Sequence, residues 1–454
     1  MEEAERLVQV IAEEWTSNGT VWCCTKEGDR FEVPYLLPGE RAQLRIRRMG
    51  RKRQVIGEIA RTATAAARTQ PRCPAFGRCG GCLLQHVAYE EQLQLKRARV
   101  IDGLKKAGIS FPQVDEVWGM EVPYHYRNKM EFSFTLEGMA GLHARADWQE
   151  VVPLHSCSIA LPAIEAALAA LTAWSKGAGL PGYDRRTQEG LLRHAAVRSS
   201  FATGEGMVTL STQRDDPGLQ AALGGLVQLL QAQMPGFCSF YWVIDPQAGD
   251  ALHLQQRRLL FGQPSIQERL GGLRYTLGPE TFFQTNTQQA EHLLALVIDL
   301  VQPTPSMQIA DLFCGVGTFS LALAQHVQEV IGVEIVPEAV HQAVANAKAN
   351  GIDNVRFFAG DVRRTFPRVT AGDPPDVVVL DPPRSGAGGK VMRSIGRSGA
   401  SRIVYVSCNP DSLGTDLAWL LPFGYEIERV QPVDLFPQTP HVESVTSLVR
   451  RVLP

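Results

Sequence analysis

The chain has 454 residues, of which 44% are hydrophobic and 20% charged, with a formal net charge of -2. One hydrophobic core does not organise a chain of this length, so we expect two or three domains. The composition excludes a largely disordered chain and a uniformly basic nucleic-acid coat. Without an apolar run of about 18 residues or a basic, apolar start, the sequence predicts a cytoplasmic protein with no membrane association.

The N-terminal part is expected to form a small β-barrel over residues 1–66. Strand-type residues occupy 8–11, 20–24, 31–33, 42–46 and 54–59, with turn signals such as Asn18-Gly19 between them. Basic residues without an intervening acid then follow at Arg41, Arg45, Arg47, Arg48, Arg51, Lys52 and Arg53. Such runs are usually a solvated surface, but seven like charges on a small barrel fit contacts with nucleic-acid phosphates at least as well.

A cysteine cluster opens the next part, residues 67–275. Cys73, Cys79 and Cys82 lie in a glycine-rich loop, and Cys157 is the best candidate for a fourth ligand. Cytosolic thiols stay reduced, so metal binding is favoured over disulfides. Four cysteines fit either tetrahedral zinc or a [4Fe–4S] cluster, and their spacing alone does not choose between them.

We expect residues 67–275 to form a central α/β domain. A basic amphipathic helix is predicted over 89–107, strands over 131–136, 195–201, 207–212 and 240–244, and helices over 161–175 and 219–233. Aromatic and basic residues alternate over 124–132, where Tyr124, Tyr126, Arg127 and Lys129 stand. This stretch fits base stacking with phosphate contacts, and equally a strand with a basic exposed face.

The C-terminal part, residues 276–454, alternates apolar strands with helices and predicts a doubly wound, Rossmann-like sheet. Helices are expected over 285–301, 319–326 and 337–349, and strands over 307–313, 330–333, 355–358, 377–380 and 403–406. The first strand leads into Gly315 and Gly317, a turn in which a ligand can lie against backbone. Ser320 replaces the third glycine of a dinucleotide fingerprint, which weakens the case for NAD. Glu334 ends the next strand and is placed to accept hydrogen bonds from ribose hydroxyls.

Cys408 stands where the last of these strands ends, before Asn409-Pro410. Single cysteines are usually buried small hydrophobes. In an open α/β sheet, however, strand carboxyl ends face the ligand crevice, so a thiol there can reach a substrate. We therefore interpret Cys408 as a candidate nucleophile whose pKa is expected to be lowered, with Arg384 as a contributor.

Several motifs together resemble the RNA uracil-5-methyltransferases that use S-adenosylmethionine. They are Asp-Leu-Phe-Cys-Gly-Val-Gly at 311–317, Asp-Pro-Pro-Arg at 381–384, Ser-Cys-Asn-Pro at 407–410 and His-Val-Glu at 441–443, with the cysteine cluster upstream. The resemblance implies a TRAM-type N-terminal barrel, a [4Fe–4S] cluster on the four cysteines and an RNA-facing stretch at 126–129. It also implies Cys408 as nucleophile and Glu443 as base. The expected cofactor-binding residues are Gln284, Phe313, Gly315, Gly317, Thr318, Glu334, Asp361 and Asp381.

The expected activity is methylation of carbon 5 of a uridine in RNA. The resemblance favours 23S rRNA over tRNA as the substrate, and the protein is expected to be a monomer. Carbon 5 of uracil is a weak nucleophile, so a thiolate must first add to carbon 6. The base must also leave its stack to reach the thiol. The sequence leaves two alternatives open: an amine-directed methyltransferase that needs no cysteine, and a catalytically inactive RNA-binding protein.

Overall fold

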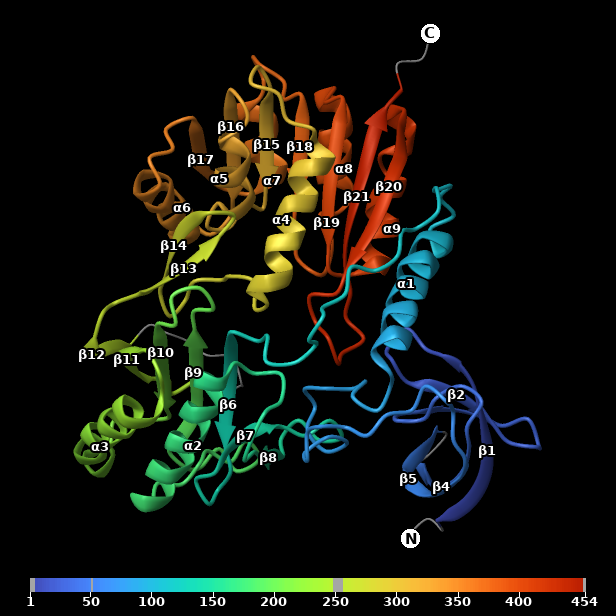
Figure 1. Ribbon diagram of the computed structural model, residues 1–454, viewed down its shortest axis with the longest axis vertical. Coiled ribbons are helices and arrows are strands. Elements are labelled where there is room, and N and C mark those ends of the chain that lie inside the picture. Colours follow the sequence, from blue (N-terminus) through green and yellow to red (C-terminus); the bar gives the residue numbers. More distant parts are fainter. Residues whose placement is uncertain (1–4, 50–51, 248–255, 452–454) are drawn as a thin grey trace.

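The computed structural model describes residues 5–49, 52–247 and 256–451. It is a mixed α/β structure built on three larger sheets and one two-stranded hairpin. The C-terminal sheet and its helices form the upper part of the molecule in Figure 1, and the central and N-terminal sheets form the lower part. The fold class predicted from the sequence is confirmed. The domain boundaries after residues 66 and 275 stay predictions.

The N-terminal sheet is antiparallel, with strand order β3-β2-β1-β4-β5. Its strands are β1 (Arg6–Trp15), β2 (Val21–Cys24), β3 (Arg30–Val33), β4 (Arg41–Met49) and β5 (Lys52–Ala63). The outer strands β3 and β5 approach each other, so the sheet curls around its apolar core. Arg41 and Arg45 are exposed. Arg51 lies outside the described residues, and so do the side chains of Arg47, Arg48, Lys52 and Arg53.

The central sheet has seven strands in the order β12-β11-β10-β9-β6-β7-β8. They are β6 (Lys129–Phe134), β7 (Ala140–His143), β8 (Val151–Pro153), β9 (Leu192–Ser199), β10 (Gly206–Thr212), β11 (Phe237–Ile244) and β12 (Arg257–Gly262). Helices α2 (Pro162–Gly177) and α3 (Pro217–Gln233) pack on each other and on this sheet. The hairpin of β13 (Ile266–Leu270) and β14 (Leu273–Leu277) then leads to the C-terminal sheet.

The C-terminal sheet has the order β17-β16-β15-β18-β19-β21-β20. Its strands are β15 (Gln308–Leu312), β16 (Glu329–Glu334), β17 (Val355–Ala359), β18 (Val377–Leu380), β19 (Arg402–Ser407), β20 (Tyr425–Val433) and β21 (Glu443–Arg450). Strands β15 to β19 run parallel, and β21 is antiparallel to both of its neighbours. The helices are α4 (Thr287–Val301), α5 (Thr318–Ala324), α6 (Pro337–Ala349), α7 (Val362–Val369), α8 (Gly389–Ser398), α9 (Pro410–Ala418) and the 3-10 turn Leu421–Phe423.

Both faces of this sheet are buried, as the continuous apolar strands predict. Ile309, Val379 and Val404 point into one core with α4 and α5. Their neighbours Ala310 and Leu380 point into a second core with α7, α8 and α9. The sheet is therefore doubly wound, and its parallel strands deliver their carboxyl ends to one edge, which faces the lower part of the molecule in Figure 1.

Helix α1 (Tyr89–Lys106) lies beside α9 although about 300 residues separate them in the chain (Figure 1). A Cβ atom at Gly103 would stand 2.4 Å from the carbonyl oxygen of Pro410, so only glycine permits this approach. Because α9 begins directly after Cys408-Asn409, the packing of α1 against α9 also supports the turn that contains Cys408. None of the helices in the described ranges combines the length and apolar character needed to cross a lipid bilayer.

Candidate active site

Cys408 and Glu443 lie close together at the carboxyl end of β19. The antiparallel pairing of β19 with β21 ends with Ser407 opposite Ser444. Cys408 directly follows this pair in the chain, Glu443 directly precedes it, and the charge of Glu443 acts on the Cys408 thiol. The structure thus brings together the two residues that the resemblance named as nucleophile and base.

The surroundings of Cys408 raise the pKa of its thiol to about 11. Burial is the largest cause, followed by the charges of Glu443 and Asp381, while Arg384 acts in the opposite direction. The expectation of a lowered pKa was wrong, because desolvation and two carboxylates outweigh one guanidinium. The protonated thiol is therefore the resting form of Cys408 at neutral pH.

The acids at this edge are themselves difficult to ionise. Glu443 is only 3% exposed, and burial, followed by the charge of Asp381, raises its pKa well above the usual range. Asp381, directly after β18, has its pKa raised to about 7 by burial and then by the charge of Asp311. Asp381 therefore titrates near neutral pH, where an acid–base group works most efficiently.

The turn after β15 leaves backbone open to a ligand and ties it to Glu334. Phe313 has a φ of 63°, and Gly317, which caps α5, has a φ of 86°. The backbone N–H of Gly315 donates to Oε2 of Glu334 at 3.0 Å, and that of Val336 donates to Oε1 at 2.9 Å. Each carboxylate oxygen retains further acceptor capacity, so Glu334 can still receive ribose hydroxyls.

Ser320 has a defined role beneath this turn. Its hydroxyl donates to Oδ2 of Asp311 at 2.5 Å, and Asp311 is fully buried with its pKa raised to about 7 by that burial. The hydroxyl therefore fastens the start of α5 to the end of β15, at the position where a dinucleotide-binding chain would have glycine.

The remaining expected cofactor residues have local partners. Asp361 caps α7, where Oδ1 accepts from the backbone N–H of Arg363 at 2.9 Å, and it pairs with that arginine's side chain at 3.0 Å. The carbonyl of Thr318 accepts from the Tyr275 hydroxyl at 3.3 Å. The carbonyl of Gln284 accepts from Nδ2 of Asn128 at 2.9 Å, which fixes the segment before α4.

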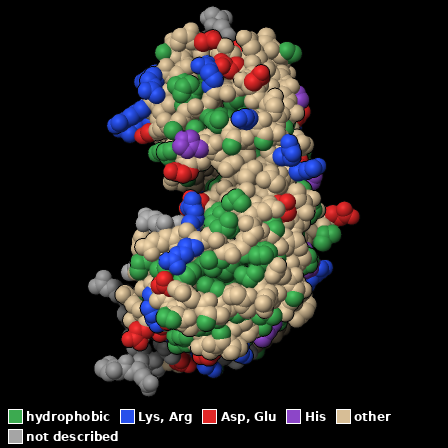
Figure 2. Space-filling model, turned by 90° about the vertical axis from the view of Figure 1, so that its left-hand side faces the viewer, with side chains coloured by type: hydrophobic (Ala, Val, Ile, Leu, Met, Phe, Trp, Pro, Cys, Tyr) green, Lys and Arg blue, Asp and Glu red, His purple; other side chains and the backbone are tan. Residues whose placement is uncertain are grey.

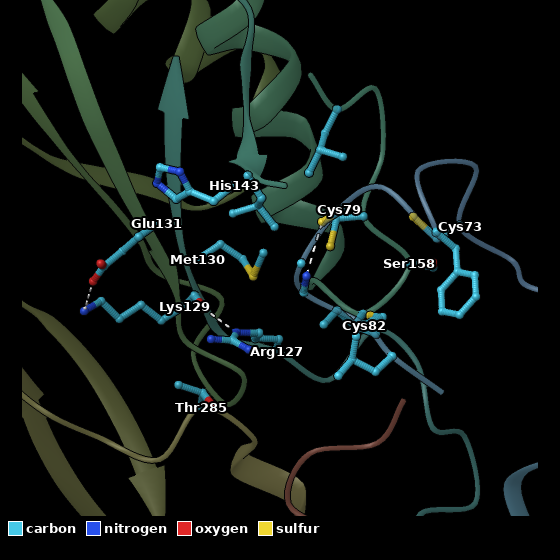
Figure 3. A pocket seen from close by; sticks show the side chains of 18 of the residues that line it. Cys73, Cys79, Cys82, Arg127, Lys129, Met130, Glu131, His143, Ser158 and Thr285 are labelled. Atoms are coloured by element: carbon cyan, nitrogen blue, oxygen red, sulfur yellow. Dashed lines mark hydrogen bonds and ion pairs between the residues drawn. The ribbon is translucent and has the colours of Figure 1, made fainter. Parts of the chain in front are cut away.

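A separate cavity of about 660 Å³ gathers Cys73, Cys79, Cys82 and Cys157. Arg127, Lys129 and Glu131, which lie on β6 or just before it, also line the cavity, and so does Thr285 (Figure 3). The cysteine loop and the central sheet therefore share one hollow. Figure 2 also shows the molecule narrowed between its upper and lower parts.

The donor chemistry of these cysteines suits a soft metal centre. Burial raises the pKa of Cys82 to about 12 and that of Cys157 to about 11, and neighbouring cysteines contribute in the same direction. A bound cation would reverse this effect by stabilising the thiolates. In the described part of the chain, however, no set of three or more His, Cys, Asp or Glu side chains is arranged as a metal site.

The stretch 124–132 is largely structural. Tyr126 is 1% exposed and donates its hydroxyl to the carbonyl of Pro437 at 2.9 Å, so of the two interpretations of this stretch, base stacking is excluded for this residue. Asn128 is buried as well. Arg127 and Lys129 remain half-buried at the cavity, where Lys129 pairs with Glu131 at 2.7 Å.

Sequence reasoning missed the segment 434–442, which links β20 to Glu443. All but Phe436 and His441 of its residues are buried, which is unusual for a connection without helix or strand. The only local sequence signal for this segment is the pair Pro437 and Pro440. These prolines predict that the segment is neither helix nor strand, but they do not predict that it is buried.

The chain is similar to known methyltransferases over nearly its whole length. Residues 252–451 match the model of the tRNA (uracil-5-)-methyltransferase family. An uncharacterized RNA methyltransferase of Clostridium acetobutylicum is 35% identical over 392 residues, 85% of this chain and 84% of the relative. Another, from Halalkalibacterium halodurans, is 33% identical and spans 97% and 96% of the two chains. The crystal structure of Pyrococcus abyssi tRNA (uracil-54, C5)-methyltransferase in complex with S-adenosyl-L-homocysteine is similar with a TM-score of 0.80, at 27% identity, over 97% of this chain and 99% of that chain.

Proposed function

Because the chain belongs to the RNA uracil-5-methyltransferase family, we propose that it transfers a methyl group from S-adenosylmethionine to carbon 5 of a uridine in RNA. The observation that carries this proposal is the location of Cys408 and Glu443 on either side of the last pair of β19 and β21, where the charge of Glu443 acts on the thiol. An amine-directed methyltransferase needs neither a thiol nor a carboxylate paired in this way. A protein that only binds RNA needs neither residue.

In the proposed mechanism, Cys408 adds its sulfur to carbon 6 of the uracil and loses its proton to a neighbouring carboxylate. Asp381 is suited to that proton, because its pKa is raised to about 7 and its charge acts on Cys408. The new bond to sulfur moves electron density onto carbon 5, which then takes the methyl group. S-Adenosylmethionine supplies that methyl group on a sulfonium leaving group.

Glu443 then removes the proton from carbon 5. The electron pair of the broken C–H bond re-forms the double bond between carbons 5 and 6, and the Cys408 sulfur leaves as thiolate. A buried carboxylate with a raised pKa is a stronger base than an exposed one, which supports this role for Glu443. It must be ionised to act, and loss of the Asp381 charge by protonation lowers its pKa and favours that state.

The methyl donor is proposed to lie along the carboxyl edge of the C-terminal sheet. Glu334 would receive the ribose hydroxyls, and Phe313, Gly315, Gly317 and Thr318 would leave backbone for close contact. Gln284, Asp361 and Asp381 would complete the site. The hydrogen bond between Gly315 and Glu334 supports the proposal, because it holds the turn against the ribose-binding carboxylate.

We also propose that Cys73, Cys79, Cys82 and Cys157 hold a [4Fe–4S] cluster, with zinc as the alternative. Their location around one cavity and their buried thiols support a soft cation with a structural role. Anaerobically purified protein should be brown, with absorbance near 400 nm. A colourless protein that contains stoichiometric zinc would contradict the iron–sulfur assignment.

The RNA substrate is proposed to be 23S rRNA, as the resemblance implies, with tRNA as a second candidate. The similar archaeal structure is a tRNA (uracil-54, C5)-methyltransferase, which favours the second. In either case the uridine must leave its stack, and the exposed Arg41 and Arg45 on β4 of the TRAM-like barrel are suited to phosphates. Mapping 5-methyluridine in both RNA classes, from cells with and without this protein, decides between them.

The central experiment uses RNA that contains 5-fluorouridine, whose carbon 5 has no proton to lose. With S-adenosylmethionine, the wild type should form a covalent complex that survives denaturing electrophoresis, and mass spectrometry should find it on Cys408. Cys408→Ala should form none. Cys238→Ala is the matched control, because Cys238 is also half-buried but lies on β11 of the central sheet. A Cys408→Ala variant that still methylates uridine would refute the mechanism.

A further inference from the structure

The 434–442 loop is held by polar groups from distant parts of the chain. Six of its carbonyl groups accept hydrogen bonds from outside the loop: those of residues 434, 435, 436, 437, 438 and 440. The donors are Gln289 and Asn286 at the start of α4, Lys96 and Arg99 of α1, Tyr126 before β6, and the backbone of Leu83 and Leu84. A connection of nine residues thus reaches the C-terminal sheet, the central part and the cysteine loop.

Asp434 fixes the first end of this loop. It forms a fully buried ion pair with Lys96, and its second oxygen accepts from the Tyr89 hydroxyl at 2.8 Å. Lys96 also donates to the carbonyl of Phe436 at 3.0 Å. A buried ion pair satisfied by further hydrogen bonds permits little rearrangement, since any movement leaves a charge unpaired. The position of Asp434 relative to α1 is therefore strictly defined.

Gln438 fixes the middle of the loop. It is 2% exposed and has a φ of 68°, in the left-handed region that non-glycine residues seldom occupy. Its carbonyl accepts from the N–H groups of both Leu83 and Leu84 at 3.0 Å. Its N–H and its side-chain oxygen both bond the amide of Gln92, at 3.1 Å each. Such a residue keeps an unfavourable backbone conformation only because its surroundings over-determine it.

These contacts hold the residues that directly precede the proposed base in the chain. Glu443 follows the loop directly as the first residue of β21, and Leu83 and Leu84 follow Cys82 directly. Movement of the loop would shift the Glu443 carboxylate relative to Cys408, and a displacement of about 1 Å can slow a catalysed step about 100-fold. The loop thus contacts the segment after Cys82 and α1, and leads directly into the proposed base.

We propose that the 434–442 loop positions Glu443 for removal of the carbon-5 proton, with Gln438 and Tyr126 as its positioning residues. This inference rests on the proposed function, in which Cys408 forms the adduct and Glu443 resolves it. The inference assigns to Gln438 and Tyr126 a role only in the last step, in which the carbon-5 proton is removed and Cys408 leaves carbon 6. Addition of Cys408 and transfer of the methyl group do not require Glu443, so those steps should proceed in variants of the loop.

The test follows the covalent complex on ordinary uridine RNA with S-adenosylmethionine, where slow proton removal makes the complex accumulate. Gln438→Gly removes the side chain and keeps the backbone conformation at low cost, since glycine favours positive φ. Tyr126→Phe deletes only the hydroxyl that holds Pro437. Tyr425→Phe is the matched control, because it deletes an equally buried hydroxyl that donates to Ala400 at 2.6 Å, at the far end of β20.

We expect single-turnover methyl transfer within about twofold of wild type in all three variants. The trapped fraction should rise about tenfold in Gln438→Gly and Tyr126→Phe, and stay at the wild-type level in Tyr425→Phe. Glu443→Gln is the reference and should trap most of the enzyme, because a lost general base slows its step by at least about 100-fold.

The outcomes separate the two proposals. If Glu443→Gln traps the complex but neither loop variant differs from Tyr425→Phe, the loop has no positioning role and the inference is wrong. If the loop variants lose methyl transfer and release equally, the loop acts only on stability, and the inference is equally wrong. If Glu443→Gln accumulates no covalent complex, Glu443 is not the base that removes the carbon-5 proton. The proposed mechanism is then wrong, and so is the inference that rests on it.

Discussion

The reactivity of Cys408 should depend steeply on pH, because its thiol has a pKa raised to about 11. At pH 7.5, roughly one molecule in 3,000 would carry the thiolate, against roughly one in ten for an ordinary cysteine with a pKa of about 8.5. Since the thiolate is the nucleophile, alkylation by iodoacetamide should be slow at neutral pH and accelerate about tenfold per pH unit.

The sign of the carboxylate contribution gives a sharper test. Glu443 raises the pKa of Cys408, so Glu443→Gln should lower that pKa and accelerate alkylation at pH 8. Arg384 acts in the opposite direction, so Arg384→Met should raise the pKa and slow alkylation. The two variants must therefore move the rate in opposite directions.

The assay is alkylation followed by mass spectrometry of the peptide that contains Cys408, at pH values from 7 to 10. Peptide resolution is necessary because the chain has nine cysteines. A rate that levels off below pH 8.5 in the wild type would show an activated thiolate and refute the electrostatic reasoning. An unchanged rate in Glu443→Gln over this whole pH range would show that the charge of Glu443 does not contribute to the raised pKa of Cys408.

Three further predictions concern stability and cofactor binding. Lys96→Met leaves Asp434 buried without its cation, and it should lower the free energy of unfolding by about 3–5 kcal/mol in urea titrations. The double variant Lys96→Met/Asp434→Asn should recover part of that loss, because no buried charge then remains unpaired. Gly317→Ala should weaken S-adenosylmethionine binding at least about tenfold in calorimetry. Its φ is 86°, and the new Cβ would stand 3.0 Å from the Phe357 ring. Gly351→Ala is the control and should bind normally, because Gly351 also has a positive φ, of 67°, but no atom lies within 4 Å of the new Cβ. Burial raises the pKa of Asp311 to about 7, so the stability that its neutral form contributes is complete below the unfolded pKa of about 4 and is lost as pH rises through 7. Asp311→Asn should therefore gain melting temperature relative to wild type between pH 5 and pH 8, and a constant difference would contradict this assignment.

The sequence by itself determined the elements and the order of the motifs along the chain. Helix 337–349 and strand 377–380 have the predicted bounds in the structure, and β1 to β5 follow the predicted strands. These features depend on local patterns, namely apolar periodicity and turn residues, which a short window of sequence contains. The placement of Glu334 at a strand end, and of Gly315, Asp381 and Cys408 after strand ends, followed from the same patterns, because parallel strands share one carboxyl edge.

The tertiary structure alone decided how these residues act on one another. The pairing of β21 with β19 brings Glu443 close to Cys408, and burial together with the charges of Glu443 and Asp381 raises the thiol's pKa, where sequence reasoning expected a decrease. The structure also shows that Tyr126, a base-stacking candidate, is buried with its hydroxyl bonded to Pro437, and that Lys96 of the predicted basic helix forms half of a buried ion pair. The burial of a side chain and the charge that acts on it depend on all of its neighbours in space. Some of these neighbours, such as α1 and β20, are more than 300 residues apart in the chain, so no local sequence pattern predicts their combined effect.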